Sequence, residues 1–354
     1  MYKFDFTRTL TRKTEINFLF TGILLFMSSC IYEDSYCDLE SPIKVDLNLK
    51  ISVDSIGKIT LPEDSVNLDS VSKEYDVRYQ VKVYKITEQS VSQTPSIEWV
   101  FLKDSLSDLN NIVKSQIAPG KYRVLVFADY VDKGSLKDKF YDTTNFNSIT
   151  IAGKYQGNSA YREAFIGEQD INVAIDNADE NGVVKVDIPM ERPFARFNIL
   201  ATDVKEYANI YFGQKLSQSK SGETPILKSI EYGNYHAEIS YIGYLPYEFD
   251  VFQKRPVDSK TGVAFKDNLR LINNETVQLG YDVVMVNGKE SSVIVGFNIY
   301  DENNKLVSSV SNVQVPLKRG QLSTLIGKFL TNGTEPNGIG IKPDFDGEFN
   351  VNIN

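Results

Sequence analysis

Alternation of apolar and polar side chains is the dominant pattern of this chain from residue 45 onward. Residues 45–51 read Val-Asp-Leu-Asn-Leu-Lys-Ile, and the same period recurs in residues 77–84, 122–127, 183–188, 194–200, 247–252, 293–300 and 307–315. The segments are rich in Val, Ile, Tyr and Phe and are bounded by Gly, Pro, Asn or Asp. A period of two places one face of a strand on a core and the other in solvent. We therefore expect an all-β protein of mostly antiparallel strands.

A helical period is found only in residues 106–117. The apolar positions of this segment are Leu106, Leu109, Ile112, Val113 and Ile117. Their spacing fits a period near 3.6, and Ser105 stands where a helix N-cap is expected. Pro119 and Gly120 follow directly and would end such a helix. We expect a short helix here, and at most one or two short helices in the whole fold.

The first 29 residues have the pattern of an export signal. Lys3, Arg8, Arg12 and Lys13 form a basic start, an apolar run follows over residues 16–27, and Ser28 and Ser29 precede Cys30. A membrane anchor or a buried helix is the alternative, but the apolar run is shorter than the roughly 20 residues that span a bilayer. Acidic residues also follow at once, so we expect residues 1–29 to be a cleaved signal peptide.

The segment around Cys30 resembles the lipobox of bacterial lipoproteins, in which the cysteine is acylated and becomes the new N-terminus. The resemblance implies attachment to the outer membrane through acyl chains on Cys30, which contribute about 0.8 kcal/mol for each buried CH₂ group. Glu33 and Asp34 resemble the acidic signal that directs some lipoproteins to the cell surface. A solvated acidic linker is an equally good interpretation of these two residues.

Charge and cysteine content narrow the class of protein further. The chain has a net charge of −9, and residues 1–29 carry a net +2, so cleavage would leave −11. Such an acidic chain lacks the basic surface that nucleic acid requires, and we expect no nucleic-acid partner. If Cys30 is acylated, Cys37 has no partner within the chain, so no disulfide framework is expected.

A domain boundary is predicted near residue 188. Residues 176–182 form a polar turn cluster, and Pro189 and Pro193 lie just beyond the strand that follows it. Proline is disfavoured inside a sheet, so we expect the chain to change sheet at this point. The expected organisation is a signal peptide over 1–29, an acylated tether over 30–44, and two β-sandwich domains over 45–187 and 188–354.

The residues that catalysis usually requires are scarce. The one histidine, His236, lies in a strand-like segment, and the chain contains no Gly-x-Ser-x-Gly elbow, phosphate-binding loop or dinucleotide fingerprint. The single tryptophan, Trp99, leaves little for the aromatic platforms of sugar sites. A secreted hydrolase is therefore the least favoured class. We expect a protein that is not an enzyme, with no cofactor and no small-molecule substrate.

Residues 344–348 (Asp-Phe-Asp-Gly-Glu) are the one stretch that suggests a metal. They are similar to the first half of a calcium loop, but the glutamate expected near position 12 has no counterpart before Asn354. We interpret the stretch as a turn that leads into a C-terminal strand with Phe349, Val351 and Ile353 on one face, and we expect no metal.

Several segments together resemble the fimbrillin superfamily, the lipoprotein precursors of type V pili. They are residues 29–37 (SCIYEDSYC), 161–167 (YREAFIG), 190–197 (MERPFARF), 315–320 (VPLKRG), 323–331 (STLIGKFLT) and 344–349 (DFDGEF). The resemblance implies two transthyretin-like β-sandwich domains and a structural subunit at the cell surface. It also implies other pilus subunits as partners, joined by β-strand donation.

In that family a protease removes the first strand after an arginine, and here the candidate strand carries Val45, Leu47, Leu49 and Ile51. Between Cys30 and Val77 all basic residues are lysines, and the first arginine, Arg78, lies inside a predicted strand. A subunit that is not cut would keep its lipid and its first strand, which favours an anchor or accessory role. The alternative is a monomeric surface lipoprotein that binds glycan or protein ligands without polymerising.

Overall fold

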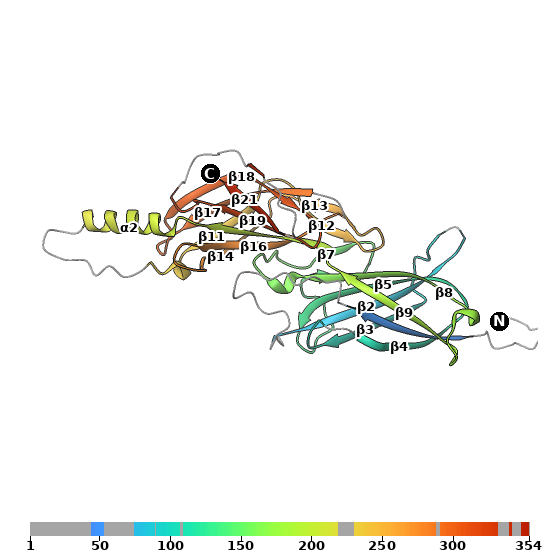
Figure 1. Cartoon of the computed structure of the whole chain (residues 1–354). Coiled ribbons are helices and arrows are strands. Elements are labelled where there is room, and N and C mark those ends of the chain that lie inside the picture. The colour runs from blue at the N-terminus through green and yellow to red at the C-terminus, as the bar shows by residue number, and fades with distance from the viewer. Residues whose placement is uncertain are drawn as a thin grey trace, which may run out of the picture. The chain divides into compact units, whose positions relative to one another are not determined.

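The computed structural model describes residues 44–52, 74–88, 90–106, 109–218, 230–287, 291–331, 340–341 and 348–353. Strands make up most of these residues, which confirms the expected all-β class (Figure 1). The described residues contain one α-helix, α2 (Val204–Gln218), and three short 3-10 turns, η1 (Ala160–Arg162), η2 (Ile175–Asn177) and η3 (Tyr232–Asn234).

A seven-stranded sheet forms the first half of the fold, in the order β3-β2-β5-β8-β9-β1-β4. Its strands are β1 (Val45–Ser52), β2 (Tyr75–Ile86), β3 (Ile97–Lys103), β4 (Leu109–Ile117), β5 (Gly120–Asp132), β8 (Ala164–Val173) and β9 (Val183–Glu191). β8 and β9 are joined through only two residue pairs, Ile166 with Glu191 and Gly167 with Met190. The sheet therefore has a narrow junction at these two strands.

β1 occupies an interior position of this sheet, with β9 parallel on one side and β4 antiparallel on the other. Residues 109–117 are thus the strand β4, and the helix expected over residues 106–117 is wrong. The reason is the pairing with β1, which matches Ile117 to Val45 and Leu109 to Ile51. Long-range backbone pairing overrides a local apolar spacing that suits a helix.

β2 and β5 are buried on both faces, unlike strands with one solvated side. On one face of β2, Val77, Tyr79, Val81 and Val83 belong to the first hydrophobic core. On the other face, Arg78, Gln80 and Lys82 are also buried. This second face lies under the residues of the loop that precedes β6 (Tyr141–Asp142), and it forms the floor of the site described below.

A four-stranded sheet, β13-β12-β7-β6, combines segments that lie far apart in the sequence. β7 (Ile149–Ile151) pairs antiparallel with β12 (Leu245–Asp250), which in turn pairs with β13 (Arg255–Lys260). Tyr247, Phe249 and Val251 accordingly pack in the first core together with residues of β2 and β5. The predicted boundary near residue 188 stays a prediction, and the hairpin β12–β13 contributes to the core on the other side of it.

The second core lies between two further sheets. The first is six-stranded, with β15 (Arg270–Leu271), β16 (Val277–Met285), β10 (Phe194–Ala201), β19 (Leu322–Gly327), β21 (Glu348–Ile353) and β20 (Gly340–Ile341) in that order. The other is four-stranded, with β14 (Ala264–Asn268), β11 (His236–Tyr241), β17 (Ser291–Tyr300) and β18 (Leu306–Leu317). The chain thus passes from the seven-stranded sheet to the six-stranded one between Glu191 and Phe194, where Pro193 lies.

Helix α2 begins after Asp203, a residue type common at helix N-caps. Its carboxylate accepts hydrogen bonds from the backbone N–H groups of Leu330 and Thr331, and from the Thr331 hydroxyl. Asp203 therefore ties the start of the helix to the segment that follows β19. None of the helices in the described part of the chain is long and apolar enough to cross a membrane.

Candidate functional site

The predicted strand residues Val45, Leu47, Leu49 and Ile51 all lie on the inward face of β1. Their side chains are at most 3% exposed and belong to the first core. The opposite face is polar, and its Lys50 ammonium lies 3.1 Å from Asp187 of β9. Four apolar side chains and two paired edges therefore hold this strand between β9 and β4.

The other predicted site residues are placed only in part. Cys30, Glu33 and Asp34 lie outside the described residues. Phe349, Val351 and Ile353 fall in β21, whose backbone pairs parallel with β19 and antiparallel with β20. Most of the calcium-like stretch, residues 344–347, lies outside the described residues as well. Their roles stay predictions.

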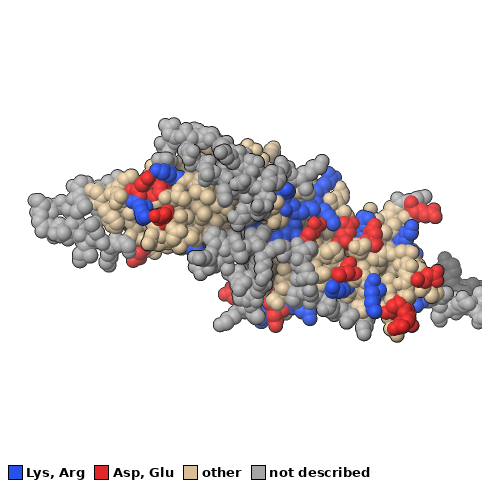
Figure 2. Space-filling view, viewed as in Figure 1, with Lys and Arg blue, Asp and Glu red and all other residues tan. Residues whose placement is uncertain are grey.

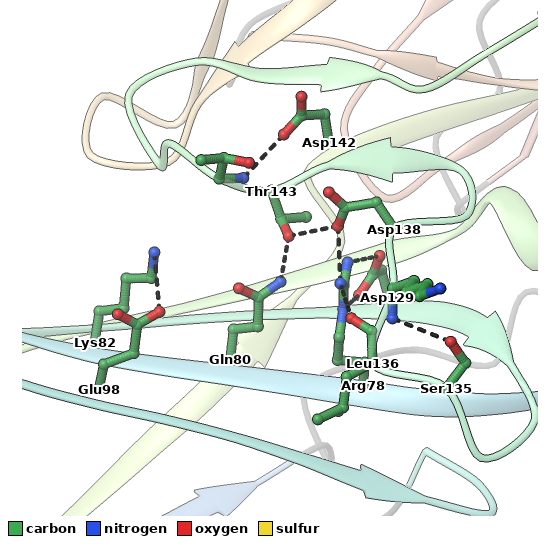
Figure 3. Close-up of polar contacts among 12 residues, drawn as sticks. Arg78, Gln80, Lys82, Glu98, Asp129, Ser135, Leu136, Asp138, Asp142 and Thr143 are labelled. Atoms are coloured by element: carbon green, nitrogen blue, oxygen red, sulfur yellow. Dashed lines mark hydrogen bonds and ion pairs between the residues drawn. The ribbon is translucent and has the colours of Figure 1, made fainter.

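The structure brings together a polar row that the sequence did not single out: Arg78, Gln80 and Lys82 on alternate positions of β2 (Figure 3). Their residues are 3%, 5% and 7% exposed. Together with Glu98 of β3 and residues 136–138, 143 and 144 they line an open pocket of about 510 Å³. In a strand of alternating apolar and polar residues, the polar positions are ordinarily interpreted as the solvated face. The sequence therefore carries no signal of a buried site here beyond the presence of three polar residues on one face.

Arg78 forms the fixed end of the row. Its guanidinium binds both carboxylate oxygens of Asp129 on β5, at 2.9 and 2.7 Å. Its remaining contacts are the Leu136 carbonyl oxygen at 2.9 Å and the Asp138 carboxylate at 2.8 Å. Burial lowers the pKa of Arg78, but the hydrogen bonds and charges of Asp129 and Asp138 outweigh it, and the net direction is upward.

Asp129 is completely buried in this arrangement. Burial raises its pKa to about 6, although the hydrogen bonds and the charge of Arg78 act in the opposite direction. A fully buried carboxylate is stable only beside a partner of this kind, because the desolvation penalty of an unpaired charge is several kcal/mol. Arg78 and Asp129 therefore form a structural pair beneath the pocket.

The middle of the row is held by an amide and a hydroxyl group. The Gln80 side-chain N–H donates to the Thr143 hydroxyl oxygen at 2.5 Å, and the Thr143 hydroxyl donates to Asp138 at 2.9 Å. Asp138 also contacts Arg78, so Arg78 and Gln80 are connected to each other through Thr143 and Asp138. Figure 3 shows these bonds running from β2 up to the loop.

Lys82 forms the open end of the row. Its ammonium lies 3.3 Å from the Glu98 carboxylate and 4.3 Å from the centre of the Phe146 ring. The Lys82 side chain is 9% exposed, whereas that of Glu98 is 45% exposed. An ammonium has three N–H donors and no acceptor, and these contacts among the described residues use one carboxylate and one ring face.

Neither a metal-ligand cluster nor the histidine accompanies the pocket within the described residues. No group of three His, Cys, Asp or Glu side chains there is placed to hold a metal ion. His236 is 7% exposed and stacks on Tyr300 with ring centres 4.9 Å apart. Burial is the main cause that lowers the pKa of His236, with the charge of Lys266 acting in the same direction.

Charges of both signs lie side by side on the face drawn in Figure 2. The exposed ion pairs include Lys328 with Glu206 at 2.7 Å and Lys205 with Glu275 at 2.5 Å. Such exposed pairs contribute little stability, typically about 0–1 kcal/mol. The two signs alternate at the left end of this view, and near its centre a group of basic side chains lies beside acidic ones.

Comparison with known proteins identifies one family and several solved structures of low similarity. No curated protein matches the chain. Among solved structures, the fimbrial anchor protein Mfa2 from Porphyromonas gingivalis is 9% identical, with 76% of this chain and 81% of that chain covered and a TM-score of 0.36. A fimbrial assembly protein from Parabacteroides distasonis is 11% identical, with 80% and 91% covered and a TM-score of 0.36. The model of the family of unknown function DUF6562 matches residues 40–354, so this chain belongs to that family.

Proposed function

We propose that this protein is a structural lipoprotein of the cell surface, an anchor or accessory subunit of a pilus assembled by β-strand addition. The observation that carries the proposal is the position of β1. It is the first described strand of the chain, yet it lies inside a sheet between β9 and β4, and its inward side chains are buried.

A terminal strand in an interior position is the element that strand exchange requires. Without β1, the facing edges of β4 and β9 would carry unpaired backbone N–H and C=O groups, and the core would lose four apolar side chains. A strand from another subunit with the same apolar alternation would satisfy both. A subunit that keeps β1 has this place filled and can end or begin an assembly.

The surroundings of Arg78 support a subunit that keeps β1. Arg78 is the first arginine after Cys30, and it is 3% exposed within β2 and bound to Asp129. A protease needs an exposed and locally mobile backbone, which a doubly paired strand does not offer. An uncut chain retains both its acyl group and β1, as an anchor must. Fimbrial anchoring and fimbrial assembly are also the roles named for the two solved proteins above.

Lipid attachment is tested by palmitate labelling in the native host. The wild type and Cys37→Ala should incorporate label, whereas Cys30→Ala should not, because the acyl chains are proposed to be on Cys30. Cys37 is the matched control, since it is the only other cysteine. Label that persists in Cys30→Ala would contradict the proposal.

Retention of β1 and assembly are tested on surface material. Mass spectrometry of the mature protein should find an N-terminus at Cys30 and all of residues 45–52. Electrophoresis of unboiled samples should show a ladder that heat dissolves. An N-terminus beyond residue 52 would indicate a shaft subunit, and a single monomer band would favour the non-polymerising alternative.

A further inference from the structure

We infer that the pocket over β2 is a binding site for a sugar unit that carries a carboxylate, with Lys82 as the residue that recognises the carboxylate. This inference does not rest on strand addition, because a subunit and a monomer would present the same pocket. The two ends of the polar row of β2, Arg78 and Lys82, differ in the partners that they contact.

The Arg78 guanidinium is already bound by other residues of the protein. It is engaged by two carboxylates and a carbonyl oxygen, so it fixes the loop over the sheet. Lys82 is placed at the other end of the row, where its nearest carboxylate, Glu98, is half exposed on an edge strand. An incoming carboxylate can therefore reach the ammonium without displacing a buried ion pair.

The residue types on the two faces of β2 also differ. The opposite face of the same strand has Val77, Val81 and Val83, which bury apolar area without desolvating a polar side-chain group. Placing Gln80 and Lys82 at 5% and 7% exposure costs stability unless their polar atoms are used. The hydrogen bond of Gln80 to Thr143 uses its N–H group, which leaves its carbonyl oxygen as an acceptor on the side of Lys82 (Figure 3).

The pocket lining indicates the chemistry of the ligand. Its charged side chains are Arg78, Lys82, Lys137, Glu98 and Asp138, and Asp129 beneath them pairs with Arg78, so the charges balance and the basic groups left for a ligand are Lys82 and Lys137. Thr143, Thr144 and Gln80 add groups that pair with hydroxyls. The volume of about 510 Å³ lies within the range of small-ligand sites. An anionic polyol of sugar size fits these features.

A neutral sugar fits less well. Sites for neutral sugars commonly present an aromatic face to the ring, but the described lining of this pocket has no aromatic residue, and Phe146, which contacts Lys82, is 1% exposed. Discrimination should therefore come from the carboxylate rather than from ring stacking.

The test uses the mature full-length protein and calorimetric titration with two matched pairs, methyl glucuronide against methyl glucoside and methyl galacturonide against methyl galactoside. We expect at least one uronide to bind and its neutral partner to bind about tenfold more weakly or not at all. Absence of binding by both uronides, or equal binding of acid and neutral forms, would overturn the inference.

Two variants locate the site. Lys82→Met keeps the length of the side chain and should weaken uronide binding about tenfold, whereas Lys85→Met, an exposed lysine on the same strand, should leave it unchanged. Glu98→Gln removes the competing carboxylate from a half-exposed position and should tighten binding about threefold. Unchanged affinity in Lys82→Met, with a thermal midpoint showing that the variant is folded, would overturn the assignment whatever the result for Glu98→Gln.

Discussion

Arg162 donates a hydrogen bond to Asp282, and the two side chains are 2% and 1% exposed although 120 residues separate them in sequence. Arg162 lies in the turn η1 before β8, and Asp282 lies on β16 of the six-stranded sheet. The hydroxyls of Tyr155 and Tyr241 donate to the other carboxylate oxygen at 2.5 and 2.6 Å. Tyr155 packs against both cores, so this network joins the two halves of the fold.

Asp282→Asn should therefore be strongly destabilising. It keeps the shape of the side chain but leaves the Arg162 charge buried without a counter-charge, which typically costs about 3–5 kcal/mol. Urea denaturation measures the loss. Glu275→Gln is the control, because its pair with Lys205 is 69% and 66% exposed and should change stability by less than about 1 kcal/mol. Equal stability of the two variants would show that the buried network does not hold the halves together.

Asp129 predicts an unusual dependence of stability on pH. Its folded pKa of about 6 lies above the value of 3.8 in an unfolded chain, so between these values the folded state binds more protons. Its contribution to stability is then greatest below about pH 4 and is lost as the pH rises through about 6, by at most about 3 kcal/mol. Unfolding free energies from pH 4 to 7 should show this loss in the wild type and not in Asp129→Asn. Parallel curves for the two proteins would contradict it.

Much of the strand framework could be predicted from the alternation of residues. The segments 45–51, 77–84, 183–188 and 293–300 all lie in strands, and the inward face of β1 was predicted residue by residue. These successes share one cause: each segment has a single buried apolar face that is visible in the local pattern. The helix predicted over residues 106–117 was wrong because β1, the partner with which this segment pairs as a strand, lies some sixty residues away in the sequence.

The pocket could not be predicted for a related reason. In residues 77–84 the polar positions Arg78, Gln80 and Lys82 suggested a solvated face, but residues of the distant segment 136–146 contact all three. Helix α2 was also missed. Its N-cap candidate Asp203 gives a weak signal, and the helix has no clear apolar stripe. Both features depend on contacts between segments that lie far apart in the sequence, and local periodicity does not reveal such contacts.

Gly167 marks the narrow junction between β8 and β9. A Cβ atom there would lie 2.7 Å from the Met190 sulfur and 2.8 Å from Ile188 Cγ2, closer than real contacts allow. Gly167→Ala should force these side chains apart and cost about 1–3 kcal/mol. Gly243→Ala, with no atom within 4 Å of its Cβ, should be nearly neutral. Thermal unfolding of both variants checks the difference, and a neutral Gly167→Ala would mean that the junction opens easily.

The hairpin β12–β13 should be essential to the first core although it comes from the second half of the chain. Phe249 is 1% exposed and packs against Phe194 with ring centres 6.2 Å apart. Phe249→Ala should cost about 3–5 kcal/mol, whereas Val257→Ala, on the exposed strand of the same hairpin, should cost less than about 1 kcal/mol. Near-ultraviolet circular dichroism through urea unfolding measures both. Similar losses would show that the hairpin is dispensable to the core.

Substitutions on the two faces of β1 should change the stability of the protein by different amounts. Leu49 is 1% exposed and faces the core, so Leu49→Ala should cost about 2–5 kcal/mol through lost burial and the cavity left behind. Asp46 is exposed on the opposite face, and Asp46→Ala should change stability by less than about 0.5 kcal/mol. If β1 is an exchangeable strand, Leu49→Ala should also speed the replacement of β1 by an added peptide of residues 45–52, which a fluorescent label on the peptide would report. Destabilisation without faster exchange would mean that β1 is a permanent part of the sheet and that assembly by strand addition must use another edge.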